Sequence, residues 1–229
     1  MKIRKTAIPM ALFWLFAVAA SFAVNYYGAV QERQLLALFS ARSYFKLILV
    51  TRQWNSRHSG VYVPVTGTTR PNPHIDEPER DLHIDATRTL TKINPAFMTR
   101  QISEIAEESS GFRFHMTSLR PIRPENGASP METQYLRQFE NGLAEGGEVI
   151  ELDDRPYYFY MAPLRTEKNC LQCHARQGYR EGDIRGGISI FFPFDSDIRV
   201  KVMLLSHVGI ALVGLAGIVL VIGKLSGRQ

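Results

Sequence analysis

Two long apolar runs, one near each end, set the strongest limit on how these 229 residues can fold. The first covers residues 6–24 and the second residues 202–223, and each can cross about 30 Å of hydrocarbon as a helix. Basic residues flank the outer end of each run: Lys2, Arg4, Lys5, Lys224 and Arg228. Because positive charge favours the cytoplasmic side, we expect a two-pass protein of the cell inner membrane. Residues 1–24 would hold the cytoplasmic tip and the first span, residues 25–201 an exported domain, residues 202–223 the second span and residues 224–229 a cytoplasmic tail.

The first apolar run can also be interpreted as a cleavable signal peptide. Ala17-Val18-Ala19 resembles a small-residue cleavage site, and a charged segment precedes it. The run is longer than a signal-peptide core of about 7–15 residues, which favours an uncleaved anchor. The five flanking basic residues account for the whole net charge of +5. A formally neutral exported domain argues against nucleic-acid binding, which needs a basic face.

The segment Cys170-Leu171-Gln172-Cys173-His174 contains the only two cysteines of the chain. Two thiols three positions apart, followed directly by a histidine, are the pattern of c-type haem attachment. Cys170 and Cys173 can each form a thioether with one porphyrin vinyl group, and His174 can then bind the iron as proximal ligand. A redox dithiol would need a βαβ context, and a zinc site would need a fourth ligand. We therefore expect one covalently attached haem c.

The residues between the two runs predict a mixture of helices and strands. Helical spacing and terminal signals predict helices over residues 31–54, 95–109 and 130–145, the second of them capped by Asn94 and stopped at Gly111. Alternation predicts strands over residues 112–118, 148–152, 157–163 and 186–194, with a turn at 153–156. Residues 55–85 are expected to be loop, and residues 195–201 a polar link. The fold class is α+β: a PAS-like antiparallel sheet with flanking helices, between two transmembrane helices.

The ligand on the opposite face of the iron stays open at this point. The candidates are His58, His74, His83, His115, Met98, Met116 and Met161. We prefer His58 as distal ligand, because the turn at Ser59-Gly60 would let the backbone approach a flat cofactor. Met98 is the next candidate, and an open or water-bound position is a further alternative. Two strong ligands would favour electron transfer or redox sensing, whereas an open position would favour sensing of a diatomic gas.

Arginines are the candidate partners of the haem propionates, because guanidinium groups suit carboxylates. The candidates are Arg120, Arg176, Arg180 and Arg185, and Arg185 is preferred. The sequence has no Ser/His/Asp arrangement, phosphate loop or HExxH motif, and solvation explains its paired acidic residues. We therefore do not expect an enzyme.

Several motifs of the exported part occur in an order that resembles a known family. They are Trp54-Asn55, residues 58–63 (HSGVYV), Pro71-Asn72-Pro73, residues 90–102 (LTKINPAFMTRQI), residues 115–121 (HMTSLRP) and residues 170–189 (CLQCHARQGYREGDIRGGIS). This set resembles a bacterial family of exported c-type haem domains with a PAS-like sensor fold, once catalogued as a domain of unknown function. Members often precede histidine kinases, chemoreceptors or diguanylate cyclases. The resemblance implies that Cys170 and Cys173 are the thioether positions and that His174 is the proximal ligand.

Resemblance and topology together predict a membrane-anchored haem protein that senses redox change or a diatomic gas. No kinase, cyclase or HAMP-like module follows Ile222, so we expect the signal to pass to a partner protein in the membrane. The alternative is a membrane-bound cytochrome c that passes electrons to a redox partner. A homodimer would suit a sensor of this layout, although the second run has no GxxxG motif.

Overall fold

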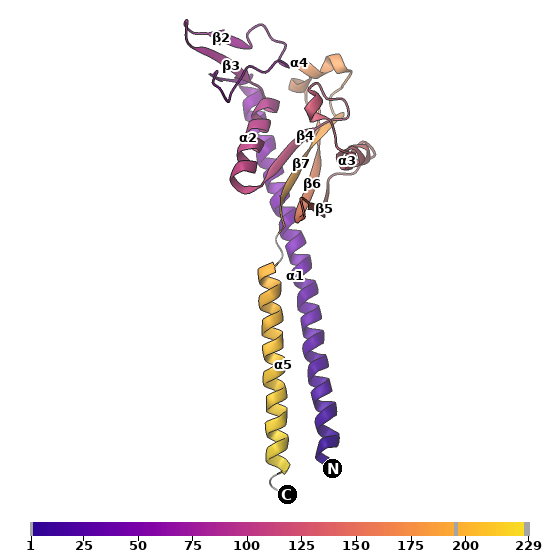
Figure 1. The fold of residues 1–229 in the computed structure, drawn as a ribbon. Helices are drawn as coiled ribbons and strands as arrows, with labels where there is room; N and C mark the ends of the chain where they lie inside the picture. The colour runs from indigo at the N-terminus through magenta and orange to yellow at the C-terminus, as the bar shows by residue number, and fades with distance from the viewer. Residues whose placement is uncertain (1, 195–196, 227–229) are drawn as a thin grey trace. The chain divides into compact units, whose positions relative to one another are not determined.

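The computed structural model describes residues 2–194 and 197–226 (Figure 1). Within these ranges the side chains are described except at residues 2–5, 169, 172, 173, 197, 198 and 226. The chain divides into two compact units, one of Met1–Ala37 with Asp195–Gln229 and one of Leu38–Phe194. Helix α1 (Lys2–Arg57) begins in the first unit and ends in the second. The predicted helix over residues 31–54 is therefore confirmed as part of one longer helix.

The first unit pairs the N-terminal part of α1 with α5 (Asp197–Ser226). The indole nitrogen of Trp14 donates a hydrogen bond to the Ala211 carbonyl over 3.3 Å. A Cβ at Gly214 would lie only 2.1 Å from the Trp14 ring, so this contact needs a glycine. Thr6–Arg57 and Arg199–Leu225 are long and apolar enough to cross a membrane, which agrees with membrane association. Of the predicted link over 195–201, residues 195–196 lie outside the described residues, and the remainder belongs to α5.

In the second unit, α1 presents one buried face to the rest of the domain. The buried residues recur every three or four positions, as a helix that packs on one side requires: Ala41, Phe45, Ile48, Arg52 and Asn55. The helix ends where Ser59 and Gly60 take positive φ angles of 57° and 93°. Gly60 N–H then donates to the Asn55 carbonyl over 2.9 Å. A Cβ at Gly60 would lie 3.2 Å from the Ile93 carbonyl, so this glycine also serves a close contact within the protein.

A small antiparallel sheet follows α1. It contains β1 (Val61–Pro64), β2 (Asp81–His83) and β3 (Thr89–Ile93) in the order β1-β3-β2. The prediction of loop over residues 55–85 was therefore wrong at β1 and β2. These strands have only four and three residues, and each depends on pairing with β3, which the sequence reasoning did not identify.

The larger sheet has four antiparallel strands in the order β4-β7-β6-β5. The strands are β4 (Arg113–Thr117), β5 (Gly146–Leu152), β6 (Arg155–Arg165) and β7 (Ile184–Pro193). All four predicted strands are confirmed. The turn between β5 and β6 is shorter than predicted, because Asp153 and Asp154 both adopt positive φ and Arg155 already pairs with Leu152.

Two helices flank the four-stranded sheet. Helix α2 (Pro95–Ser110) has the predicted Asn94 cap, which accepts from Phe97 N–H, and the predicted Gly111 stop. Helix α3 (Pro130–Glu140) ends earlier than the predicted residue 145. Asn141 caps it, and Gly142 leaves the helix with φ 98°. Leu136 and Phe139 of α3 pack on the buried β6 side chains Phe159 and Met161. The predicted α+β class with antiparallel sheets and flanking helices is confirmed, in two sheets rather than one.

Candidate functional site

The segment with both cysteines connects β6 to β7 through three short helical turns. These are η2 (Lys168–Cys170), α4 (Leu171–His174) and η3 (Ala175–Gln177). Backbone bonds close the base of the connection, because Thr166 N–H donates to Asp183 O over 2.8 Å and Gly182 N–H donates to Thr166 O over 2.9 Å. The Cys170 side chain is half-buried. The side chain of Cys173 lies outside the described side chains.

A hydrogen-bond chain fixes the His174 ring. Its Nδ1 lies 2.5 Å from Gln177 Oε1, and Gln177 Nε2 donates to the Arg120 carbonyl over 3.2 Å. The second bond requires the amide nitrogen of Gln177 to face Arg120, so the amide oxygen faces His174. The proton of the neutral ring is then on Nδ1, and Nε2 keeps its lone pair. This is the arrangement that second-shell groups give to a metal-binding histidine.

The surroundings of His174 favour its neutral form. Burial lowers the pKa of His174, and the charges of Arg185 and Arg52 lower it further, against the Gln177 hydrogen bond. Neutral imidazole is the form that binds a metal ion. The Tyr179 ring meets the imidazole edge to face, with ring centres 6.2 Å apart. His174 is therefore held neutral and oriented.

Arg52 of α1 belongs to the same neighbourhood. It lies within electrostatic reach of Arg185 and Cys170. Its Nη1 donates to the Pro95 carbonyl over 3.0 Å, to Thr99 Oγ1 over 2.9 Å and to Met116 Sδ over 3.2 Å. These bonds join α1, the start of α2 and β4 around one guanidinium group.

Among the predicted propionate partners, Arg185 lies within electrostatic reach of His174. It stands at the start of β7, where Ser118 Oγ donates to its carbonyl over 2.8 Å. Arg120 instead stacks over the Tyr179 ring at 4.6 Å. Arg176 is exposed and lies 3.7 Å from Asp76. Arg180 is also exposed, and its backbone N–H donates to Asp183 Oδ2 over 2.7 Å.

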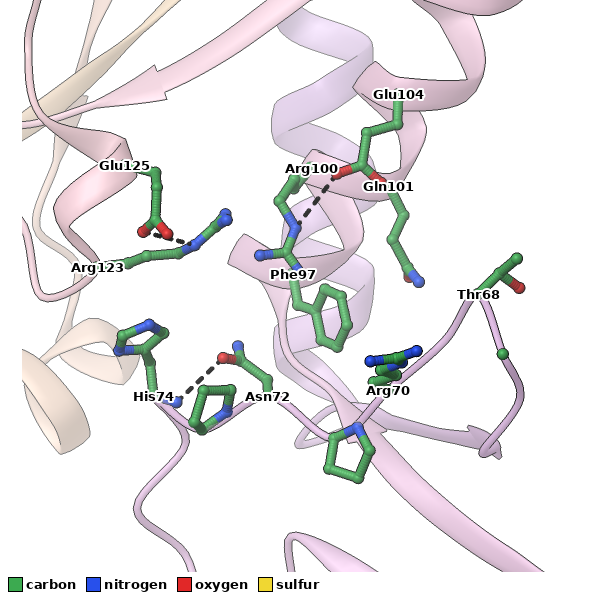
Figure 2. Close-up of a pocket in the computed structure, with 13 residues that line it drawn as sticks. Thr68, Arg70, Asn72, His74, Phe97, Arg100, Gln101, Glu104, Arg123 and Glu125 are labelled. Carbon is green, nitrogen blue, oxygen red and sulfur yellow. Dashed lines mark hydrogen bonds and ion pairs between the residues drawn. The ribbon is translucent and has the colours of Figure 1, made fainter.

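A cavity of about 370 Å³ lies beside α2, the loop after β1, and the turn at η1 (Pro124–Asn126). Figure 2 shows its charged lining. Arg100 stacks on Phe97 at 4.4 Å, and Arg123 pairs with Glu125 at 3.1 Å. Two contacts join the connection between β6 and β7 to residues that lie near this cavity in the chain. Arg176 lies 3.7 Å from Asp76, and Gln177 Nε2 donates to the Arg120 carbonyl.

The structure places the histidines predicted as distal candidates in different surroundings. His58 is exposed, donates from Nδ1 to the Trp54 carbonyl over 2.7 Å and stacks on the Trp54 ring at 4.5 Å. His83 bonds to Thr89 Oγ1 over 3.0 Å. Both ring nitrogens of His115 face acceptors, Glu132 Oε1 at 2.8 Å and Glu125 O at 3.2 Å. His74 lines the cavity of Figure 2. Among the contacts of the described residues, none joins His58 to the segment from Cys170 to His174, so its ligand role stays a prediction.

The three candidate methionines also differ. Met98 Sδ lies 3.6 Å from Asn55 Nδ2, and its side chain lines an apolar cavity of about 210 Å³ between α1 and α2. Met116 Sδ accepts a hydrogen bond from Arg52, which itself lies within electrostatic reach of Arg185. Met161 is fully buried in the core below α3.

Sequence reasoning missed two residues of this neighbourhood, Arg52 and Gln177. Arg52 did carry a detectable signal, because it occupies a position of the buried helical face otherwise filled by apolar residues such as Phe45 and Ile48. A charged residue in such a position indicates a special partner. Gln177 gave no such signal, because an amide three residues after His174 is common on a short turn.

Comparison with known proteins places this domain in a family. The Tll0287-like family model, Tll0287, matches residues 32–193, from within α1 to the end of β7. The chain belongs to the Tll0287-like family. The match includes all of the motifs, over residues 54–189 of this Tll0287-like chain, that carry the resemblance. One similar solved structure is the "Crystal structure of the cyanobacterial heme-protein Tll0287", with 17% sequence identity and a TM-score of 0.42, covering 72% of this chain and 98% of that chain. No curated protein matches the chain.

Proposed function

We propose that this chain is a membrane-anchored c-type haem protein that senses a redox change or a diatomic gas on the exported side of the inner membrane. Cys170 and Cys173 attach one haem, and His174 is its proximal ligand. The observation that carries the proposal is the CxxCH motif, whose histidine is held neutral with Nδ1 bonded to Gln177. The family takes its name from Tll0287, whose structure is titled a heme-protein, and this agrees with the proposal.

The donor set of the segment fits a c-type haem. The two thiol positions and the imidazole occur in the order that this attachment requires. Since Gln177 occupies Nδ1 of His174, Nε2 is the nitrogen that would bind iron. A bound haem would supply an iron that changes oxidation state and can take a second axial ligand. Tyr179 packs on the imidazole and helps to hold its orientation.

Chain connectivity supports the sensor function over simple electron transfer. Arg52 contributes to the site from α1, and the same uninterrupted helix contains the first apolar run over residues 6–24. Arg185 contributes from β7, which ends at Pro193, shortly before α5 begins at Asp197. Both candidate spans are therefore continuous or nearly continuous with elements that supply a cation to the site. A change of charge or ligation at the iron can bias these elements, as a switch requires, and a partner protein would receive the signal.

The proposal includes a PAS-like sensor fold, supported by the four-stranded antiparallel sheet with α2 and α3 at its sides.

The alternative function is that of a membrane-bound cytochrome c. Met116 favours this alternative, because its sulfur lies next to Arg52 and a thioether is the second axial ligand found in cytochromes c.

Hydrogen exchange of the full-length protein in lipid nanodiscs tests the proposal. The protein is measured in its ferric, ferrous and carbon monoxide-treated ferrous states, with absorption spectra recorded in parallel. A sensor is expected to change amide protection in residues 38–57 and in β7 between at least two states, while the distant strand β5 serves as the internal control. Reversible reduction with identical exchange in all states would support the cytochrome alternative. A folded protein without haem would contradict both functions.

A further inference from the structure

Arg52 is a buried cation that has neutral partners only. It is 9% exposed, and its three hydrogen bonds go to a carbonyl, a hydroxyl and a thioether. All three use Nη1. Within the described part of the chain, no aspartate or glutamate forms an ion pair with Arg52, and its Nε and Nη2 donate to no residue.

Among the described residues, the other partly buried arginines of this unit have a carboxylate beside them, with the exception of Arg185. Arg42 pairs with Glu145, Arg80 with Asp81 at 2.6 Å and Arg113 with Glu107 at 2.9 Å. The arginine with the deepest burial thus lacks the partner that most of the more exposed ones possess. A buried charge without a counter-ion is strongly unfavourable, and hydrogen bonds to neutral groups offset this only in part.

A second cation makes the deficit of negative charge larger. Arg185 lies within electrostatic reach of Arg52, and both act on His174. Cys170 lies within the same reach of Arg52. An anionic group on a cofactor attached at Cys170 would therefore come within electrostatic reach of two cations, one of which has an unused donor edge. A planar guanidinium edge formed by Nε and Nη2 matches a carboxylate with two parallel hydrogen bonds.

We propose that Arg52, together with Arg185, binds a propionate carboxylate of the attached haem, and that Arg52 thereby connects the charge of the haem to α1. The inference rests on the proposed haem function. Three bonds from Nη1 to α2 and β4 position the guanidinium group, and its other edge receives the carboxylate. Because Arg52 is part of an uninterrupted helix, the same residue ties the haem to the helix that continues into the first unit.

The test compares Arg52→Met, Arg185→Met and Arg52→Lys with the matched control Arg155→Gln. Arg155 is an exposed arginine at the start of β6, whereas the attachment segment follows the end of that strand. Each full-length variant is purified with its haem, quantified as the pyridine haemochrome, and its midpoint potential and resonance Raman propionate bending modes are measured. Methionine has the length of the arginine stem without the charge, so both Met variants are expected to attach haem, to show a lower potential and to shift a propionate mode. Arg52→Lys should give a smaller shift of the potential, and Arg155→Gln none.

Unchanged potential and propionate modes in both Arg52→Met and Arg185→Met would overturn the inference. If one Met variant does not fold, the other and Arg52→Lys still decide the result, because each alters the same pair of cations. A wild-type protein that carries no haem would instead contradict the proposed function, and the haemochrome measurement separates these two failures.

Discussion

Two histidines of the same domain have similar hydrogen bonds and opposite charge preferences. His115 on β4 and His174 on α4 are both half-buried, and each has its Nδ1 bonded to a side-chain oxygen. The hydrogen bond to Glu132 raises the pKa of His115, although burial opposes this. Burial lowers the pKa of His174, and Arg185 and Arg52 lower it further. A carboxylate on Nδ1 favours the charged form of His115, whereas burial and two nearby cations favour the neutral form of His174.

The Nε2 atoms of His115 and His174 also differ in their hydrogen bonds. His115 Nε2 lies 3.2 Å from the Glu125 carbonyl, so both nitrogens can donate and the imidazolium is fully satisfied. Among the described residues, His174 Nε2 has no hydrogen-bond partner. A charged histidine with two acceptors stabilises the fold, whereas a neutral histidine with one available nitrogen is suited to an iron ligand.

We expect the largest difference between the two histidines when each imidazole is removed by substitution with alanine. His174→Ala should abolish the wild-type absorption spectrum of the reduced haem, because the iron loses its proximal ligand. His115→Ala is the matched control and should keep the spectrum, because its ring is committed to Glu132. Absorption spectra normalised to the pyridine haemochrome provide the measurement. A lost spectrum in His115→Ala with a retained one in His174→Ala would reverse the assignment.

Glu132→Gln should produce the largest loss of stability. The Glu132 side chain is only 2% exposed and accepts from His115 Nδ1 over 2.8 Å, from Ser189 Oγ over 2.5 Å and from Ser129 N–H over 2.9 Å. A glutamine amide would place donors against donors and remove the charge that pairs with His115. We expect the free energy of unfolding to fall by about 3 kcal/mol.

Denaturant unfolding of the full-length protein in detergent measures this loss. Glu140→Gln, an exposed change at the end of the same helix, should alter the free energy of unfolding by less than about 0.5 kcal/mol. Equal stability of the two variants would show that the hydrogen bonds of Glu132 to His115, Ser189 and Ser129 do not stabilise the fold.

The pH dependence of the domain's stability should come from the His115–Glu132 pair. A raised folded pKa means that the His115–Glu132 interaction contributes its full stability below the unfolded histidine pKa of about 6.5 and loses it as pH rises through the folded value. Burial raises the pKa of Glu132, but the hydrogen bonds from His115, Ser189 and Ser129 and the charge of His115 together lower it below its ordinary value. The contribution is therefore also lost as pH falls through that folded value. Because His115 is partly exposed, we expect about 1 kcal/mol.

Thermal unfolding at pH 6 and pH 8 provides the measurement for this prediction. The wild type should lose more stability between these values than His115→Gln, which can still donate to Glu132 but does not titrate. The same pH dependence in both proteins would assign it to other groups.

Gln177→Glu should give the smallest effect and would make His174 resemble His115. A carboxylate on Nδ1 makes the imidazole a stronger donor, which favours the ferric state by about 1 kcal/mol and lowers the midpoint potential. Gln177→Ala, which removes the oxygen, is the control and should not lower it. A higher potential in Gln177→Glu would contradict the proposed hydrogen bond.

The features that could be predicted from the sequence are those that depend on residues close together in the chain. Local chemistry fixes the Asn94 cap, the Gly111 stop and the long strand β6, and each was predicted. The strands β1 and β2 were missed, because three or four residues form a strand only when a partner such as β3 is placed beside them.

The candidate site divides in the same way. The CxxCH spacing is local and directly readable, and it identifies the attachment segment with its histidine. Arg52 is 118 residues from Cys170 in the chain, so only the tertiary fold shows that they are neighbours. Arg185 was predicted from residue type alone, and the structure gives it electrostatic contact with His174.

The intact mass of the full-length chain, produced in cells with a cytochrome c maturation system, tests the central claim most directly. We expect the mass of the polypeptide plus one haem, retained after acid–acetone extraction. A folded chain with the mass of the polypeptide alone, and with both Cys170 and Cys173 open to alkylation, would contradict it.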